Sequence, residues 1–496
     1  MPEFENTVTP GRDYSGLPDR KRRRESDILE QAAFFHLVIL IIGLSWWFGG
    51  QSPGARQAVL LWTTAGIALF LIAWGNPRLL GCHRYTPLRY LWPLFIFDII
   101  VLISCLNPTT RVIMNQGEQM FLHTDPRWAF LPSTARPDLS WRELWLANGI
   151  IISAFNAFLI LHSRRILRQL LVVVAVNAFV LAVFGTFQKL YGATGLWFNA
   201  VPTPQPYFFS TFVYHNHWGA FTTLNIAACL GLLFNAYRRG GHRDFWHSPV
   251  FLGAVAILFI AATAPLSSSR STTALLTLFL FGALVHFLFQ LIRRRRDRHE
   301  SPFLPLAGIG LAAMLAVAGI VYLSQDVIRV RALHTQQQLV NIRTEDALNT
   351  RLQLYRDTIT MGAAKPVFGW GLESYADVFR IYNTQRAREL WFGQRVYREA
   401  HNDWLQSFAE NGIVGTSLLL LLGVLPLLGV PWRRLRSPLP YYLLAGCVLV
   451  LLYAWVEFPF ANPSVMVAFW LSLFIASRYA RLDLLTQQAE KDAQNA

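Results

Sequence analysis

One histidine stands at the start of a predicted helix, where its chemistry would be useful. The run from Ala400 to Gln406 leads into an apolar stretch, and Asn402 or Asp403 can cap a helix there. Asn411-Gly412 can end that helix. His401 would then lie at the positive end of the helix dipole, where a protonated imidazole is disfavoured. A neutral histidine is the form required of a general base, so His401 is our candidate for that role.

A second group of polar residues shares a predicted helix upstream. Apolar side chains recur at spacings of four, three and four residues, at Leu348, Leu352, Tyr355 and Ile359. This amphipathic helix must end near Pro366, and Arg351, Tyr355 and Thr358 are neighbours on it. Gly369-Trp370-Gly371 follows as a predicted turn, because glycine reaches backbone angles closed to other residues. The region is therefore expected to be folded and helical.

The elements that must position these residues are predicted membrane spans. The chain has 496 residues, 53% hydrophobic and 15% charged, which excludes a disordered chain and disfavours a soluble enzyme. Apolar runs of about 17 to 25 residues can cross the hydrocarbon core. We find twelve, at 31–49, 57–75, 88–106, 144–161, 170–188, 217–236, 249–265, 272–292, 303–324, 412–430, 440–456 and 463–477. Asp98 lies inside the third, where we expect it to pair structurally.

The net charge of +15 is explained by topology. With the basic N-terminal tail placed in the cytoplasm, alternation puts every compact arginine cluster inside as well. The inside segments carry 26 Lys and Arg against 13 Asp and Glu, whereas the outside segments carry 18 against 15. No basic stripe with interleaved aromatic residues remains, so nucleic-acid binding loses its support. Both termini are expected in the cytoplasm and His401 outside.

The predicted organisation is all-α and GT-C-like, with about 12 transmembrane helices and one large periplasmic loop that contains helices. Residues 1–27 are expected to form a disordered cytoplasmic tail, and 28–204 the first five spans with an irregular loop at 107–142. A core follows at 205–477 with a catalytic loop at 325–411, and 478–496 form a cytoplasmic tail.

Several motifs in this core resemble one known family. They are Arg351 with Tyr355, Pro366, Gly369 and Gly371, the Ala400–Gln406 run, Ala409-Glu410 and Gly412–Gly415, preceded by Phe212–Ala220 and Ser269-Arg270 and followed by Glu457-Phe458-Pro459. In this order they resemble the O-antigen ligase and O-antigen polymerase superfamily, which are bacterial membrane glycosyltransferases that use glycans on undecaprenyl diphosphate. Ser271 and Tyr355 depart from the residues common in the family, which leaves the subfamily open.

The resemblance implies a site. Arg270 and Arg351 would clamp the diphosphate, because a guanidinium pairs bidentately with phosphate oxygens. His401 would act as base or orient the acceptor, with Lys189 as a further phosphate contact. The remaining substrate-binding candidates are Asn216, His217, Tyr355 and Asn402. No metal and no cofactor are expected. Other interpretations stay open: Arg270 could anchor its span, and Arg351 could pair with Glu345 or Asp346.

The expected reaction is transfer of a glycan from undecaprenyl diphosphate to an acceptor hydroxyl at the periplasmic face of the bacterial inner membrane. The first choice of acceptor is a lipid A core sugar, and the alternative is polymerisation of lipid-linked repeats. A lipid-linked glycan flippase or other transporter is the alternative from a different class, and a structural scaffold is another. The expected partners are these donors and acceptors together with membrane lipids, and the oligomeric state stays open.

Overall fold

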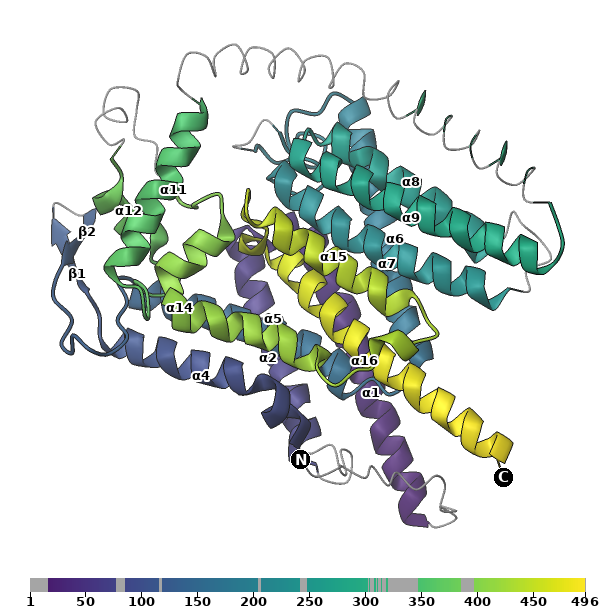
Figure 1. Ribbon diagram of the computed structural model, residues 1–496. Helices are drawn as coiled ribbons and strands as arrows, with labels where there is room; N and C mark the ends of the chain where they lie inside the picture. Colours follow the sequence, from purple (N-terminus) through teal and green to yellow (C-terminus); the bar gives the residue numbers. More distant parts are fainter. Residues whose placement is uncertain are drawn as a thin grey trace.

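The computed structural model is a bundle of long helices with a smaller folded layer at one end (Figure 1). It describes residues 17–76, 85–115, 118–203, 207–240, 248–301, 347–384 and 397–495, with isolated residues between 303 and 319. The long helices are α1 (Leu17–Trp46), α2 (Pro53–Gly75), α4 (Thr86–Leu106), α5 (Pro137–Leu159), α6 (Arg164–Leu190), α7 (His215–Arg239), α8 (Pro249–Leu266), α9 (Arg270–Asp297), α14 (Asp403–Val424), α15 (Leu439–Tyr453) and α16 (Pro463–Asn495).

Within the described residues, nine helices are long and apolar enough to cross a membrane. The protein is therefore an all-α integral membrane protein. Two further expected spans correspond to α5 and to the short apolar α15. The expected span 303–324 lies almost wholly outside the described residues. Asp98 in α4 accepts a hydrogen bond of 2.9 Å from Asn148 of α5, which confirms the expected structural pairing.

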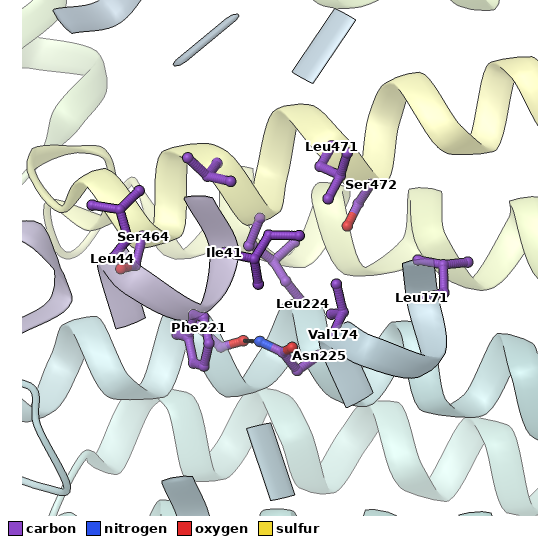
Figure 2. Close-up of a pocket in the computed structure, with 12 residues that line it drawn as sticks. Ile41, Leu44, Leu171, Val174, Phe221, Leu224, Asn225, Ser464, Leu471 and Ser472 are labelled. Carbon is purple, nitrogen blue, oxygen red and sulfur yellow. Dashed lines mark hydrogen bonds between the residues drawn. The ribbon is translucent and has the colours of Figure 1, made fainter. Parts of the chain in front are cut away.

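The centre of the bundle is formed by α5, α7 and the first half of α16, whose side chains are mostly buried. Helix α7 packs against α15, α8, α6 and α16. An enclosed space of about 20 Å³ lies between α1, α6, α7 and α16, lined mainly by apolar side chains such as Ile41 and Leu224 (Figure 2). A space of that volume holds about one water molecule, so it is no path for a glycan.

The layer at one end contains α11 (Ala347–Ala364), α12 (Tyr375–Tyr382) and the strands β1 (Thr110–Asn115) and β2 (Glu118–His123) (Figure 1). Its helices and the start of α14 enclose a second core, made of Ala135, Leu354, Met361, Trp370, Tyr375, Val378, Phe379, Ala400 and Ala409. The helix expected around Leu352 is α11, but the apolar face expected for it was wrong. Leu352 and Ile359 are 49% and 48% exposed, and Leu354 and Met361 pack into this core instead.

Two expectations about irregular segments were wrong. Residues 107–142 contain an antiparallel pair, in which Thr110 of β1 faces His123 of β2, and α5 begins at Pro137. The four prolines of this segment lie outside both strands and therefore do not interrupt the pairing. Of the N-terminal tail that was expected to be disordered to residue 27, residues 1–16 lie outside the described residues, whereas 17–27 belong to α1, which continues into the first span without a break.

Candidate active site

Glu457 is the residue on which the polar contacts of the candidate site converge. It lies in the turn after α15, and its side chain is only 6% exposed. One carboxylate oxygen accepts a hydrogen bond of 3.2 Å from the Arg351 guanidinium on α11. The other accepts one of 3.2 Å from the Tyr214 hydroxyl, just before α7, and lies 3.5 Å from Nδ1 of His401. Four segments distant in sequence therefore meet at this carboxylate.

The turn that carries Glu457 is held by the start of α14. Asn402 caps this helix, because its side chain accepts from the backbone N–H of Leu405 at 3.0 Å, as the sequence predicts. Its amide also donates to the carbonyl of Trp455 at 2.9 Å. Asp403 donates its backbone N–H to Ala454 at 2.9 Å and accepts from the N–H of Phe460 at 3.0 Å. These bonds fix the position of Glu457 relative to α14.

His401 is held in an unusual backbone conformation directly before that cap. Its φ is 52°, in the left-handed region that non-glycine residues rarely adopt. The Tyr355 hydroxyl donates to its carbonyl at 3.0 Å, and its ring meets the ring of Phe458 edge to face with centroids 4.8 Å apart. These contacts aim Nδ1 at Glu457, while the side chain stays 31% exposed. The other ring nitrogen is the one available to a substrate.

A chain of hydrogen bonds leads from Glu457 to the start of α9. Tyr214, which donates to Glu457, accepts from the side-chain amide of Asn216 at 2.8 Å. The amide oxygen of Asn216 in turn accepts from the Ser269 hydroxyl at 2.7 Å. Ser269 directly precedes Arg270, the exposed first residue of α9. Asn216 thus links the start of α9, where Arg270 lies, to the Glu457 site.

The glycine turn after α11 joins that helix to α14. Gly369 and Gly371 have φ of 70° and 98°, which confirms the predicted turn. The backbone N–H groups of Trp370 and Gly371 donate to the carbonyls of Ala409 and Glu410 at 2.9 and 2.8 Å. The helical backbone of α14 breaks there at Gly412, whose φ is 63°, and then resumes. The helix end expected at Asn411-Gly412 is thus a break inside α14. The break leaves the carbonyls of Ala409 and Glu410 without helical partners, and the glycine turn supplies the N–H groups that bond to them.

Electrostatics favour an ionised carboxylate at Glu457. Burial by itself would raise the pKa of Glu457, but His401, Arg351 and Tyr214 outweigh it, so that the pKa lies below its ordinary value. Burial and the nearby Glu457 carboxylate together raise the pKa of the Tyr214 hydroxyl, which therefore stays a neutral hydrogen-bond donor. The site thus has one buried negative charge between a histidine and an arginine.

The structure brings together five of the residues expected from the sequence, namely His401, Arg351, Tyr355, Asn216 and Asn402. Two others have different surroundings. His217 is almost fully buried, and its Nε2 hydrogen-bonds the carbonyl of Phe458 at 3.2 Å, which supports the Glu457 turn. Lys189, at the end of α6, places its ammonium 4.4 Å from the centroid of the Phe208 ring, and no described contact links it to Glu457.

The residues missing from the sequence-based set are Glu457, Tyr214 and Asp403. Each lies inside a motif that was noted, so a signal was present in Glu457-Phe458-Pro459 and in the Phe212–Ala220 run. The sequence gives no sign that Arg351 pairs with Glu457. Among the described residues, no group of three or more His, Cys, Asp or Glu side chains is arranged to hold a metal ion.

A comparison with protein families identifies the region that contains much of this site. Residues 253–420 match the O-antigen ligase family model. The matched segment covers α8, α9, α11, α12 and most of α14, and includes Arg270, Arg351 and His401. This O-antigen ligase domain confirms the resemblance to the O-antigen ligase and polymerase superfamily, and it supports glycosyltransferase activity of that type. No curated protein matches the chain.

Proposed function

We propose that this protein transfers a glycan from undecaprenyl diphosphate to an acceptor hydroxyl at the periplasmic face of the bacterial inner membrane. The observation that carries the proposal is the convergence of His401 and Arg351 on Glu457 within contact distance. A lipid A core sugar is the first choice of acceptor. Joining of two lipid-linked repeats is the alternative reaction for the same site.

His401 is the proposed base. The Glu457 carboxylate beside Nδ1 favours the tautomer with a proton on that nitrogen, which leaves the Nε2 lone pair for the acceptor hydroxyl. The same carboxylate stabilises the imidazolium that forms when Nε2 takes the proton. The acceptor oxygen then bonds to the anomeric carbon of the donor as the bond from that carbon to the diphosphate oxygen breaks.

The two arginines would receive the negative charge of the leaving group. Arg351 uses one nitrogen for Glu457, and its side chain is 49% exposed, so further N–H donors face solvent. Arg270 directly follows Ser269, whose hydroxyl donates to Asn216, so the start of α9 is held close to the site. Guanidinium groups remain charged and pair with phosphate oxygens, and so they can stabilise the departing undecaprenyl diphosphate.

Transport of a lipid-linked glycan is less well supported than transfer. A transporter needs a polar route through the bilayer, whereas the space that the described residues leave between α1, α6, α7 and α16 is lined mainly by apolar side chains. The charged contacts described above gather instead at one end of the bundle, around Glu457. That arrangement suits chemistry at the membrane surface.

Reconstituted transfer tests the proposal. Purified protein in detergent would receive a lipid-linked glycan with either lipid A core or a second lipid-linked glycan, and the products would be resolved by mass. Product with only one acceptor decides between ligase and polymerase. His401→Ala and Arg351→Ala should abolish transfer in protein that still elutes as a single species. An absence of product with either acceptor from folded wild-type protein would overturn the enzymatic proposal.

A further inference from the structure

A second cavity, whose lining includes an arginine and a histidine, lies at the end of the bundle opposite Glu457. It has a volume of about 410 Å³ and is open to the surroundings between the ends of α7, α9 and α15. Its polar lining comes from Arg238, His286, Gln290, Ser437 and Tyr442. Helix α7 runs from the candidate site to this cavity, and 25 residues at about 1.5 Å each separate the two by roughly 35 Å. The cavity therefore takes no part in the proposed transfer.

The cavity offers both charge and ordered hydrogen-bonding groups. Arg238 donates one hydrogen bond to the carbonyl of Arg436, which leaves other donors of its guanidinium for a ligand. His286 and the Tyr442 hydroxyl are 2.7 Å apart, and the amide of Gln290 is 2.8 Å from the other ring nitrogen of His286. The ring of His286 also stacks on Phe234, with centroids 4.8 Å apart. These side chains are therefore held in fixed orientations.

Apolar side chains continue outward from this polar end. On α9, Val285, Phe289 and Ile292 are exposed by 49%, 65% and 42%, and on α15 Val448 is exposed by 53%. Exposed apolar residues on membrane-spanning helices face lipid chains. A ligand that fits both regions has an anionic head for Arg238 and hydrocarbon chains for the helix faces. A free phosphate would use only the first region.

We infer that this cavity binds the headgroup of an anionic phospholipid, with Arg238 as the main contact to its phosphate. Basic pockets between membrane helices at the cytoplasmic side are suited to such headgroups. Arg294 lies near the same helix ends, where it donates to the carbonyl of Tyr237, and adds positive charge around the opening. Arg239 is not among the residues that line the cavity. Ala445 lies on the cavity wall, where a larger side chain would occupy the space of the ligand.

Native mass spectrometry of the full chain in detergent tests the inference. Dioleoylphosphatidylglycerol is titrated in, with dioleoylphosphatidylcholine and inorganic phosphate as separate arms. Arg238→Gln should weaken phosphatidylglycerol binding roughly fivefold, since one basic side chain near an anionic surface contributes about 1 kcal/mol. Ala445→Trp should weaken it at least as much by filling the cavity. Arg239→Gln, at the adjacent position on α7, should leave binding unchanged.

Four results would overturn the inference. Equal losses in Arg238→Gln and Arg239→Gln would show attraction by net charge alone. Equal binding of phosphatidylcholine would remove the role of the anionic head, and full displacement by millimolar phosphate would assign the cavity to a free anion. If Arg238→Gln elutes as aggregate, unchanged binding in folded Ala445→Trp would by itself reject the cavity as the binding place.

Discussion

At the scale of single residues, the candidate site depends on one buried carboxylate. Glu457 touches Arg351, Tyr214 and His401, and each contact favours its ionised form. A buried charge is costly unless it is paired, so removing any partner should affect the others. The proposed general base, the proposed diphosphate contact and their common carboxylate are therefore expected to act as one unit, and their substitutions should combine non-additively.

Glu457→Gln should lower the rate of transfer by about 10²- to 10⁴-fold, the range attributed to general base catalysis. The amide would donate to Nδ1 of His401 and so favour the tautomer whose Nε2 already carries a proton. The measurement is the initial transfer rate with lipid-linked donor. Asp377→Asn serves as control, because it removes a 2.6 Å ion pair with Arg136 in the same layer. A Glu457→Gln rate within tenfold of the control would contradict the proposed role.

Glu399, two residues before His401, should make stability depend on pH. Burial, and second the neighbouring Glu373, raise its pKa from 4.5 to about 7. Between these two values the folded chain keeps a proton that the unfolded chain releases. The contribution of Glu399 to the free energy of unfolding is therefore complete below about pH 4.5 and is lost as the pH rises through 7. Glu399→Gln should therefore melt higher than wild type at pH 8 and alike at pH 4.5.

Thermal melts of detergent-solubilised protein at both pH values check this difference. Glu490→Gln, on the exposed C-terminal part of α16, is the matched control and should follow wild type at each pH. If Glu399→Gln and the wild type have the same melting temperature at pH 8, ionisation of Glu399 does not destabilise the folded protein, and the prediction is wrong.

At the scale of elements, the glycine turn joins α11 to the break in α14. A Cβ built on Gly369 would lie 2.3 Å from the backbone of Glu410, so alanine cannot fit without moving the two segments apart. Gly369→Ala should therefore lower the melting temperature and also transfer activity, because α11 carries Arg351. Gly429→Ala is the control for conformation alone: it has φ of 74° but nothing within 4 Å of the added atom. Equal melting temperatures of Gly369→Ala and Gly429→Ala would show that the contact between Gly369 and Glu410 has room for a methyl group.

The sequence predicts local elements better than their partners. The cap at Asn402, the turn at Gly369 and the presence of a helix around Leu352 were predictable, because each depends on neighbours within a few residues. The face that this helix buries was predicted wrongly, because it is set by contacts with distant segments. The pairing of Arg351 with Glu457 joins positions 106 residues apart, and no local pattern encodes it. The β1–β2 pair was missed since the prolines around it were taken as signs of irregular structure.

At the scale of the whole molecule, the contacts divide the polar residues between two ends. Arg164 pairs with Asp483 at 2.6 Å and Arg238 bonds to Arg436, so basic clusters from α6, α7 and the region before α15 gather at one end with α16. Glu457 and its partners lie at the other. This separation agrees with the topology expected from the charge bias, in which arginine clusters stay in the cytoplasm.

Cysteine accessibility tests this topology. In a variant whose native cysteines are replaced by serine, Phe130→Cys should react with a membrane-impermeant maleimide in cells with a permeabilised outer membrane. Phe130 is 79% exposed in the segment before α5. Asp492→Cys, on the exposed end of α16, should react only after lysis. Labelling of Asp492→Cys in intact cells would reverse the proposed orientation.

The backbone of His401 implies a conflict between stability and activity. A residue with a Cβ in the left-handed region costs about 1 kcal/mol, and glycine avoids most of this cost. His401→Gly should therefore match or slightly exceed the melting temperature of His401→Ala, while both lack transfer activity. A position where the best residue for folding differs from the residue present is one where selection has favoured chemistry over stability. Among substitutions that lose the Glu457 contact, those at His401 should therefore rank with glycine the most stable, and none of them should transfer a glycan.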